Sequence, residues 1–162
     1  QVDFLRVNST VDIVGCWIEE FDENMNSKII VYPTSHNEIF RFFVKRDPLP
    51  HSGVMFRKSF FYKAGNYNVL YKKDQDTELW FRGFLNGAIF ADVPLVLLFF
   101  RKSSDTFTKR KKFHRIFSYF SLRLLITRKL RYGFKGYFFS IVYCVIQLLP
   151  LKLTMLLYKF LR

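Results

Sequence analysis

The stretch VDIVGCWI (residues 11–18) decides the fold, because it is a short, largely apolar run that is rich in β-branched side chains and is followed by polar sequence. Runs of this length and composition are typical of buried strands. The stretch KIIVY (residues 28–32) has the same character, and an acidic, polar segment (residues 19–27) separates the two. The sequence therefore predicts two strands joined by a turn.

Helical patterns follow these strands. Ser35 stands three residues before Glu38, which is the spacing of a capping box, and predicts a helix that ends at residues 47–50. A second helix is expected to follow the acidic cluster of residues 74–78. Its core-facing side chains are predicted to be Leu79, Trp80, Phe84 and Leu85.

Further strands complete the first part of the chain. Residues 53–56 predict a short buried strand, and a helical turn after it is expected to end at Gly65. Residues 88–92 and 95–100 predict two strands divided by Pro94, the second so apolar that burial on both faces is expected. Strands that alternate with helices predict an α/β fold. The first residues resemble the end of a helix, so we expect the chain to be a fragment.

The charge is distributed very unevenly. The net charge is +13, but residues 1–100 carry 11 Lys/Arg and 12 Asp/Glu, whereas residues 101–162 carry 15 and 1. The two parts of the chain therefore face different solvents or partners. We expect a domain boundary between residues 108 and 109.

The last third predicts two kinds of helix. Residues 109–131 predict a basic amphipathic helix, and residues 134–149 predict a helix that is apolar on every side. The apolar face of the first is expected at Phe113, Ile116, Phe117, Phe120 and Leu124, and its cationic side includes Arg110, Lys111, Arg115, Arg123, Arg128 and Lys129.

This tail predicts attachment to an anionic membrane surface. Spanning is not expected, because Gln147, Pro150 and Lys152 interrupt the apolar run before it reaches the roughly 20 residues that a bilayer requires. Packing of the tail against the α/β domain is the alternative. A basic tail can also bind nucleic acid, but the interleaved apolar residues and the lack of a recognised motif argue against that partner.

An ordered series of motifs resembles the family 2 glycosyltransferases of the GT-A fold, over about residues 1–110. The stretches that carry the resemblance are VDIVGCWIEEFDE (residues 11–23), PTSHNEIF (33–40), HSGVMFRKS (51–59), AGNY (64–67), DQDTELWFR (74–82) and NGAIFADVPLVLLFFR (86–101). The resemblance implies the C-terminal, acceptor-side portion of a Rossmann-like nucleotide-diphospho-sugar transferase domain. The tail is similar to those of bacterial exopolysaccharide and lipopolysaccharide enzymes of the amylovoran type.

The resemblance implies one catalytic residue, Asp76. Its place before Leu79 and Trp80 matches the family's acidic motif, which supplies the general base that takes the proton from the acceptor hydroxyl. Family precedent is inversion without a covalent intermediate. The alternative is that Asp76 or Asp74 only caps the following helix.

The same resemblance implies substrate contacts. The candidates are His51, Asp74, Gln75, Trp80 and Arg57. Each has a plainer alternative: His51 as a surface residue, Trp80 as a core residue, and Arg57 as a solvated cation.

The resemblance also implies partners and a cofactor. The family holds a divalent metal, Mn or Mg, on the donor diphosphate with a DxD motif that we expect upstream of residue 1. Asp74-Gln75-Asp76 has the letters of that motif but the position of the base motif, so no metal is assigned to this chain. The implied partners are a nucleotide-sugar donor and a lipid-linked saccharide acceptor at the cytoplasmic face of the bacterial inner membrane. The fragment is expected to be inactive alone, and a non-catalytic membrane- or nucleic-acid-binding module is the rival function.

Overall fold

The computed structural model describes residues 1–71, 73–101, 113–150 and 153–154. The chain divides into two units, Gln1–Arg101 and Lys102–Arg162. The boundary expected between residues 108 and 109 lies outside the described residues.

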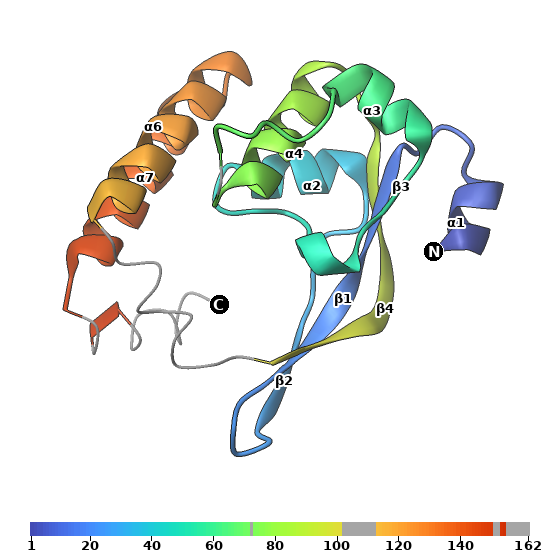
Figure 1. The fold of residues 1–162 in the computed structure, drawn as a ribbon, viewed down its shortest axis with the longest axis horizontal. Helices are drawn as coiled ribbons and strands as arrows, with labels where there is room; N and C mark the ends of the chain where they lie inside the picture. The colour runs from blue at the N-terminus through green and yellow to red at the C-terminus, as the bar shows by residue number, and fades with distance from the viewer. Residues whose placement is uncertain (72, 102–112, 151–152, 155–162) are drawn as a thin grey trace. The chain divides into compact units, whose positions relative to one another are not determined.

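A four-stranded mixed sheet forms the centre of the first unit (Figure 1). Its strands are β1 (Ile13–Phe21), β2 (Ser27–Ile30), β3 (Met55–Phe56) and β4 (Phe90–Arg101). β4 runs parallel along the whole of β1, while β3 and β2 pair antiparallel with its first and last residues. The predicted turn was too long, because residues 19–21 continue β1 and place Glu20 opposite Lys28 of β2, a favourable cross-strand pair of charges.

β4 corrects the prediction of two strands divided by Pro94. It is one continuous strand whose register with β1 jumps from Cys16–Val93 to Trp17–Val96. Pro94 thus lies in a bulge, where its missing N–H removes no ladder hydrogen bond. The prediction of burial on both faces was also wrong, because alternate side chains after the bulge are exposed, namely Leu95 (59%), Leu97 (50%) and Phe99 (69%).

The helices of the first unit are α1 (Val2–Val7), α2 (His36–Phe43), α3 (Lys58–Ala64) and α4 (Gln75–Leu85), with a 3-10 turn, η1 (His51–Gly53). The predicted capping box is confirmed: the Ser35 hydroxyl accepts from the Glu38 amide, and the Glu38 carboxylate accepts from the Ser35 amide. Gly65 ends α3 as expected, at φ +72°, a conformation that favours glycine. Leu85 is 46% exposed, so its predicted core position was wrong.

Helices cover both faces of the sheet. Consecutive strand residues point to opposite faces, and Ala91 packs with Leu5 of α1, whereas Phe90 contacts the rings of Phe60 and Trp80 from α3 and α4. The first unit therefore has a mixed α/β fold with a small sheet between helices.

Within the described residues of the second unit, the helices α6 (Phe113–Lys129) and α7 (Gly133–Leu148) pack together. The predicted apolar face of α6 was wrong in part, because Ile116 is buried but Phe117 is 47% exposed. The buried side of α6 lies about one residue further round the helix and includes Arg123, which was expected on the cationic side. Within the described residues, no helix is both long and apolar enough to cross a bilayer.

Candidate active site

Five of the six predicted site residues lie at or beside the beginning of α4: His51, Asp74, Gln75, Asp76 and Trp80. Asp76 is in the first turn of α4, Trp80 follows one turn later, and His51 begins η1. Tyr67, from the loop after α3, connects them: its hydroxyl is 2.8 Å from His51 Nε2, and its ring meets the His51 ring edge-on at 5.7 Å. The carboxylate of Asp76 is near enough to raise the pKa of Tyr67.

The Asp76 carboxylate is half-buried and held at one oxygen. Its Oδ1 accepts a hydrogen bond of 2.9 Å from the Thr77 amide, and among the described residues none donates to Oδ2. The Thr77 hydroxyl donates to Asp47 Oδ1 at 2.7 Å and so fixes this turn. Asp74 occupies the N-cap position but makes no side-chain cap hydrogen bond. Asp76 therefore satisfies one first-turn amide and keeps its second oxygen available to a proton donor.

Tyr67 is the site residue that sequence reasoning missed. Burial first, and then the charge of Asp76, raises the pKa of the phenol, so the hydroxyl stays neutral and can donate a hydrogen bond. The AGNY motif contains this residue, and an aromatic side chain just after the helix-ending Gly65 was the available signal. Its partner could not be identified from spacing alone.

A buried ion pair positions the loop that carries Tyr67. Arg82 and Glu78, one turn apart on α4, are joined by hydrogen bonds of 2.7 and 2.8 Å. The Arg82 guanidinium also donates to the carbonyls of Ala64 and Asn66. Because these carbonyls lie immediately before Tyr67, α4 fixes both Asp76 and the tyrosine.

Trp80 belongs to the core. Its side chain is fully buried, stacks on Phe56 at 5.8 Å, and lies 5.9 Å from the His51 ring. This burial matches the alternative given for Trp80, and the indole supports His51 from the interior. Gln75 is exposed and Asp74 is half-buried at the beginning of the same helix.

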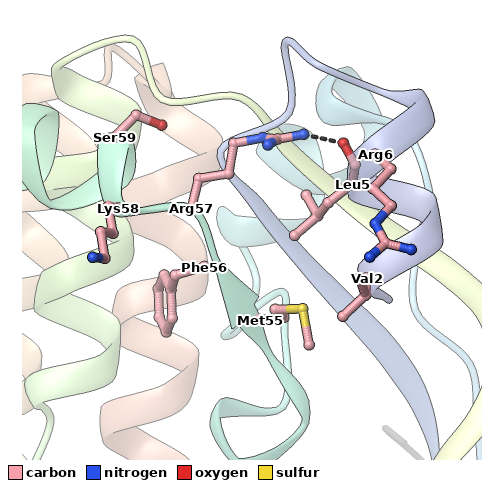
Figure 2. Close-up of a pocket in the computed structure, with 8 residues that line it drawn as sticks. All are labelled: Val2, Leu5, Arg6, Met55, Phe56, Arg57, Lys58 and Ser59. Carbon is pink, nitrogen blue, oxygen red and sulfur yellow. Dashed lines mark hydrogen bonds between the residues drawn. The ribbon is translucent and has the colours of Figure 1, made fainter.

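Arg57 lies in a different place, at an open hollow of about 430 Å³ between α1 and β3 (Figure 2). Its Nε donates to the Val11 carbonyl at 2.7 Å, and its NH2 group donates to the carbonyls of Leu5 and Asn8. The guanidinium therefore ties α1 and the following loop to the beginning of β1. The hollow is lined by Val2, Leu5, Arg6, Met55, Phe56, Arg57, Lys58 and Ser59.

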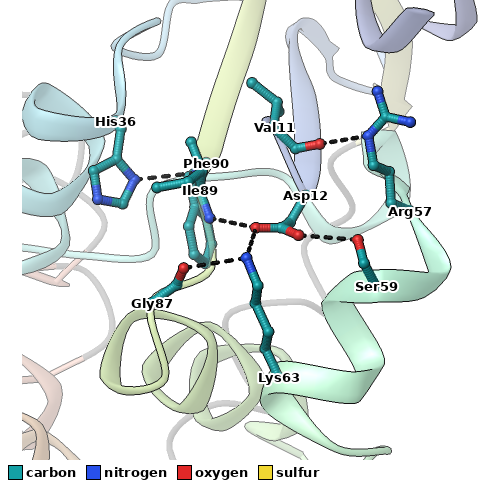
Figure 3. A network of polar contacts seen from close by, with 9 residues as sticks. All are labelled: Val11, Asp12, His36, Arg57, Ser59, Lys63, Gly87, Ile89 and Phe90. Carbon is teal, nitrogen blue, oxygen red and sulfur yellow. Dashed lines mark hydrogen bonds and ion pairs between the residues drawn. The ribbon is translucent and has the colours of Figure 1, made fainter. Parts of the chain in front are cut away.

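Hydrogen bonds around the buried carboxylate of Asp12 join the beginning of β1 to α3 and to the beginning of β4 (Figure 3). Asp12 accepts from Lys63 Nζ at 2.7 Å, from the Ser59 hydroxyl at 3.0 Å and from the Ile89 amide at 2.8 Å. Burial acts to raise the pKa of Asp12, but these three donors outweigh it and the pKa lies below its usual range. The network holds the elements that flank the candidate site.

Asp92 is a buried carboxyl of the opposite kind. It lies on β4 opposite Gly15, is 2% exposed, and neither of its oxygens has a hydrogen-bond partner of ordinary geometry among the described residues. Burial raises the pKa of Asp92 to about 8, and the neighbouring Val93 amide opposes only part of that rise. A side chain at Gly15 would collide with this carboxyl and with Leu49.

The described residues offer no ready metal site. Among them, no three His, Cys, Asp or Glu side chains are grouped so that they could hold a metal ion. Asp74 and Asp76 alone do not provide the ligand set of a divalent cation.

Comparison with known proteins shows distant homology to bacterial glycosyltransferases. The chain is 30% identical over 161 residues to the amylovoran biosynthesis glycosyltransferase AmsE of Erwinia amylovora, a match that covers 98% of the chain and 60% of that protein. It is 33% identical over 110 residues to the UDP-Gal:alpha-D-GlcNAc-diphosphoundecaprenol beta-1,3-galactosyltransferase of Escherichia coli, with 67% of the chain and 40% of that protein covered. An uncharacterized glycosyltransferase of Haemophilus influenzae is 32% identical over 114 residues, with 68% of the chain and 41% of that protein covered.

These matches cover only part of each relative. The chain spans between 40% and 60% of the length of the three proteins named above. No family model and no solved structure matches it.

Proposed function

We propose that this chain is the acceptor-side part of an inverting glycosyltransferase of the GT-A type. The complete enzyme transfers a sugar from a nucleotide-diphosphate sugar to a lipid-linked or polysaccharide acceptor during the synthesis of cell-surface polysaccharide. The homology to glycosyltransferases and the mixed α/β fold support the reaction class. One observation carries the mechanism: a half-buried carboxylate at the beginning of α4, with one oxygen held and the other open, beside a His–Tyr pair.

Asp76 acts as the general base in this proposal. A sugar hydroxyl attacks the anomeric carbon, its proton passes to Asp76 Oδ2, and the nucleotide diphosphate departs with the electron pair of the broken bond. A base within hydrogen-bond reach contributes roughly 10² to 10⁴-fold. The amide of Thr77 fixes the carboxylate, so little reorganisation is needed when the acceptor arrives.

The neighbouring residues orient the substrates. The neutral Tyr67 phenol and the His51 ring form one hydrogen-bonded unit that can meet an acceptor hydroxyl or a diphosphate oxygen. Gln75 and Asp74 lie beside the base and are suited to further acceptor hydroxyls. Arg57 is committed to three backbone carbonyls, so its part is to shape the adjoining loop.

The donor and acceptor classes follow from a relative. The Escherichia coli protein named above uses UDP-Gal and a diphosphoundecaprenol-linked sugar. We extend the classes, a UDP-sugar and a polyprenol-diphosphate-linked saccharide, to the complete enzyme that contains this chain. We also propose that a DxD motif outside this chain holds the Mn or Mg ion, so the chain alone does not turn over.

The basic second unit suits the place where such an acceptor is found. Each Lys or Arg near an anionic surface contributes about 1 kcal/mol of binding free energy, and residues 102–162 carry 14 of them. We therefore place the enzyme on the cytoplasmic face of the bacterial inner membrane.

The test is a carboxylate-to-amide exchange in the complete transferase. Asp76→Asn is expected to lower kcat by about 10² or more while the circular dichroism spectrum is unchanged. Glu23→Gln, an exposed carboxylate in the turn between β1 and β2, is the matched control and should retain full activity. Turnover of Asp76→Asn within a factor of two or so of the unsubstituted enzyme would remove Asp76 as the base.

A further inference from the structure

The helix α7 buries small and polar residues and exposes large apolar ones, which is the reverse of a helix at a water-facing surface. Its buried residues are Gly136, Ser140 and Gln147. Its exposed side carries a continuous stripe of large apolar side chains, each 51–84% exposed, at positions i, i+4, i+7, i+11 and i+14. These five residues, called the α7 stripe below, are Phe134, Phe138, Ile141, Val145 and Leu148.

The contact of α7 with α6 combines small and polar groups with one aromatic contact, in which the ring centroids of Tyr119 and Tyr143 are 4.5 Å apart. Gly136 of α7 packs closely on Thr127 of α6. A Cβ atom added to Gly136 would lie 2.5 Å from the methyl carbon of Thr127. The Ser140 hydroxyl donates to the Gly136 carbonyl at 2.7 Å, and Gln147 is 5% exposed. Water-soluble helices bury their apolar side, whereas small-residue contacts and internal polar groups are typical of helices surrounded by lipid.

The charges around the stripe indicate which apolar medium covers it. Neither α6 nor α7 contains an Asp or Glu. Four exposed cations surround the turn between the helices, next to Phe134 at the end of the stripe: Arg128 and Lys129 at the end of α6, Arg131 in the turn, and Lys135 at the beginning of α7. A cationic end beside an apolar stripe complements a layer of anionic headgroups above acyl chains.

We propose that the α7 stripe lies in the acyl region of a bilayer with anionic headgroups, and that the four cations at the turn contact those headgroups. α7 then lies along the membrane surface with Gly136, Ser140 and Gln147 turned toward α6. The sequence predicted attachment of the whole tail, and this proposal assigns the inserted side chains to one face of α7. Insertion of the stripe also contributes an apolar component of membrane binding, which salt does not screen, in addition to the electrostatic one.

The first experiment separates the apolar component from the electrostatic one. The 162-residue chain is mixed with phosphatidylcholine–phosphatidylglycerol vesicles and sedimented at low salt and at about 1 M salt, where the Debye length is about 3 Å. We expect binding to persist at high salt. Phe138→Ser/Ile141→Ser/Val145→Ser should lower the high-salt partition coefficient roughly 100-fold, since each half-exposed side chain contributes about fivefold.

A matched control removes exposed apolar side chains elsewhere. Val69→Ser/Leu70→Ser changes residues that are 81% and 84% exposed in the first unit, and it should leave vesicle binding unchanged. A loss of binding equal to that of the stripe variant would mean that general stickiness, and not α7, holds the vesicle, and the proposal would fail.

A conservative probe covers the case in which the triple variant does not fold. Ile141→Cys in a Cys144→Ser background is labelled with an environment-sensitive fluorophore, since Cys16 is buried. With vesicles present, a blue shift and quenching by acyl-chain nitroxides are expected. A label that stays in water, or a vesicle-free dimer that the triple variant dissociates, would overturn the proposal and assign the stripe to a second copy of the chain.

This inference stands apart from sugar transfer. Vesicle binding is measured without donor or acceptor, so loss of turnover in Asp76→Asn leaves its outcome unchanged, and failure to bind vesicles leaves the base assignment intact.

Discussion

Replacing Asp92 by asparagine should change the pH dependence of folding. In the folded chain the pKa of this buried carboxyl is about 8, whereas an unfolded aspartate has a pKa of about 3.9. Between those values the folded state keeps a proton that the unfolded state has lost. The contribution of Asp92 to the free energy of unfolding is therefore greatest below about pH 4, and it falls by about 1.4 kcal/mol per pH unit between about pH 4 and about pH 8.

The magnitude follows from that interval. A pH of 7 is about three units above the pKa of the carboxyl in the unfolded chain. The buried acid therefore lowers the free energy of unfolding at pH 7 by about 4 kcal/mol relative to acidic conditions. Asparagine has nearly the same size and does not ionise. Its buried amide adds a cost of about 1–3 kcal/mol that is the same at every pH, so the slope with pH, and not the stability at one pH, carries the prediction.

The assay is urea unfolding followed by tryptophan fluorescence, which reports on the first unit because Trp17 and Trp80 both lie there. Unfolding free energies are measured at intervals from about pH 4.5 to about pH 8. The unfolding free energy of the variant minus that of the unsubstituted chain should rise by about 1.4 kcal/mol per pH unit. A flat difference for Asp92→Asn would show that the carboxyl is ionised or solvated in the folded state, and the argument from burial would be refuted.

Three other changes test further features. Asp12→Asn should lower the unfolding free energy by about 2 kcal/mol near neutral pH, because it removes the charge of a buried carboxylate that accepts three hydrogen bonds, one of them from the partly exposed Lys63. The difference should shrink in urea titrations below about pH 4, since the lowered pKa of Asp12 makes its stabilisation disappear as the carboxylate is protonated. Tyr67→Phe should lower kcat of the complete transferase about tenfold with the fold retained, as a lost hydrogen bond to the site histidine predicts, while Tyr62→Phe, at an 85% exposed position, should not. Gly136→Leu should separate the helices of the second unit by collision with Thr127 and reduce helical circular dichroism; unchanged helicity and thermal melting would contradict the close packing.

Local signals in the sequence predicted much of the first unit. The capping box of Ser35 and Glu38 and the break at Gly65 act through adjacent backbone, so their structure can be inferred without knowing the rest of the fold. The alternating α/β order followed from the period of the apolar residues. The His51 and Asp76 positions came from the order of motifs.

Features that depend on distant contacts could not be predicted. Pro94 suggested a strand break, but pairing with β1 absorbs it in a bulge. The contact of the Tyr67 hydroxyl with His51 depends on a loop that Arg82 of α4 holds through the carbonyls of Ala64 and Asn66, and spacing in the sequence does not reveal this. In α6, the apolar spacing predicted part of the wrong face, because Tyr119, Leu122 and Ile126 are buried and Arg123 is buried with them.

The parallel pairing of β1 with β4 has a consequence for synthesis on the ribosome. Asp12, whose carboxylate accepts a hydrogen bond from the Ile89 amide, is 77 residues from Ile89 in the sequence. β4 is the last element of the first unit. A nascent chain that has released β1 and the following helices therefore still exposes an unpaired strand edge until nearly the whole unit has left the exit tunnel. Such a delay favours capture by chaperones or joining of edges between neighbouring chains, and slow translation before residue 90 would lengthen it.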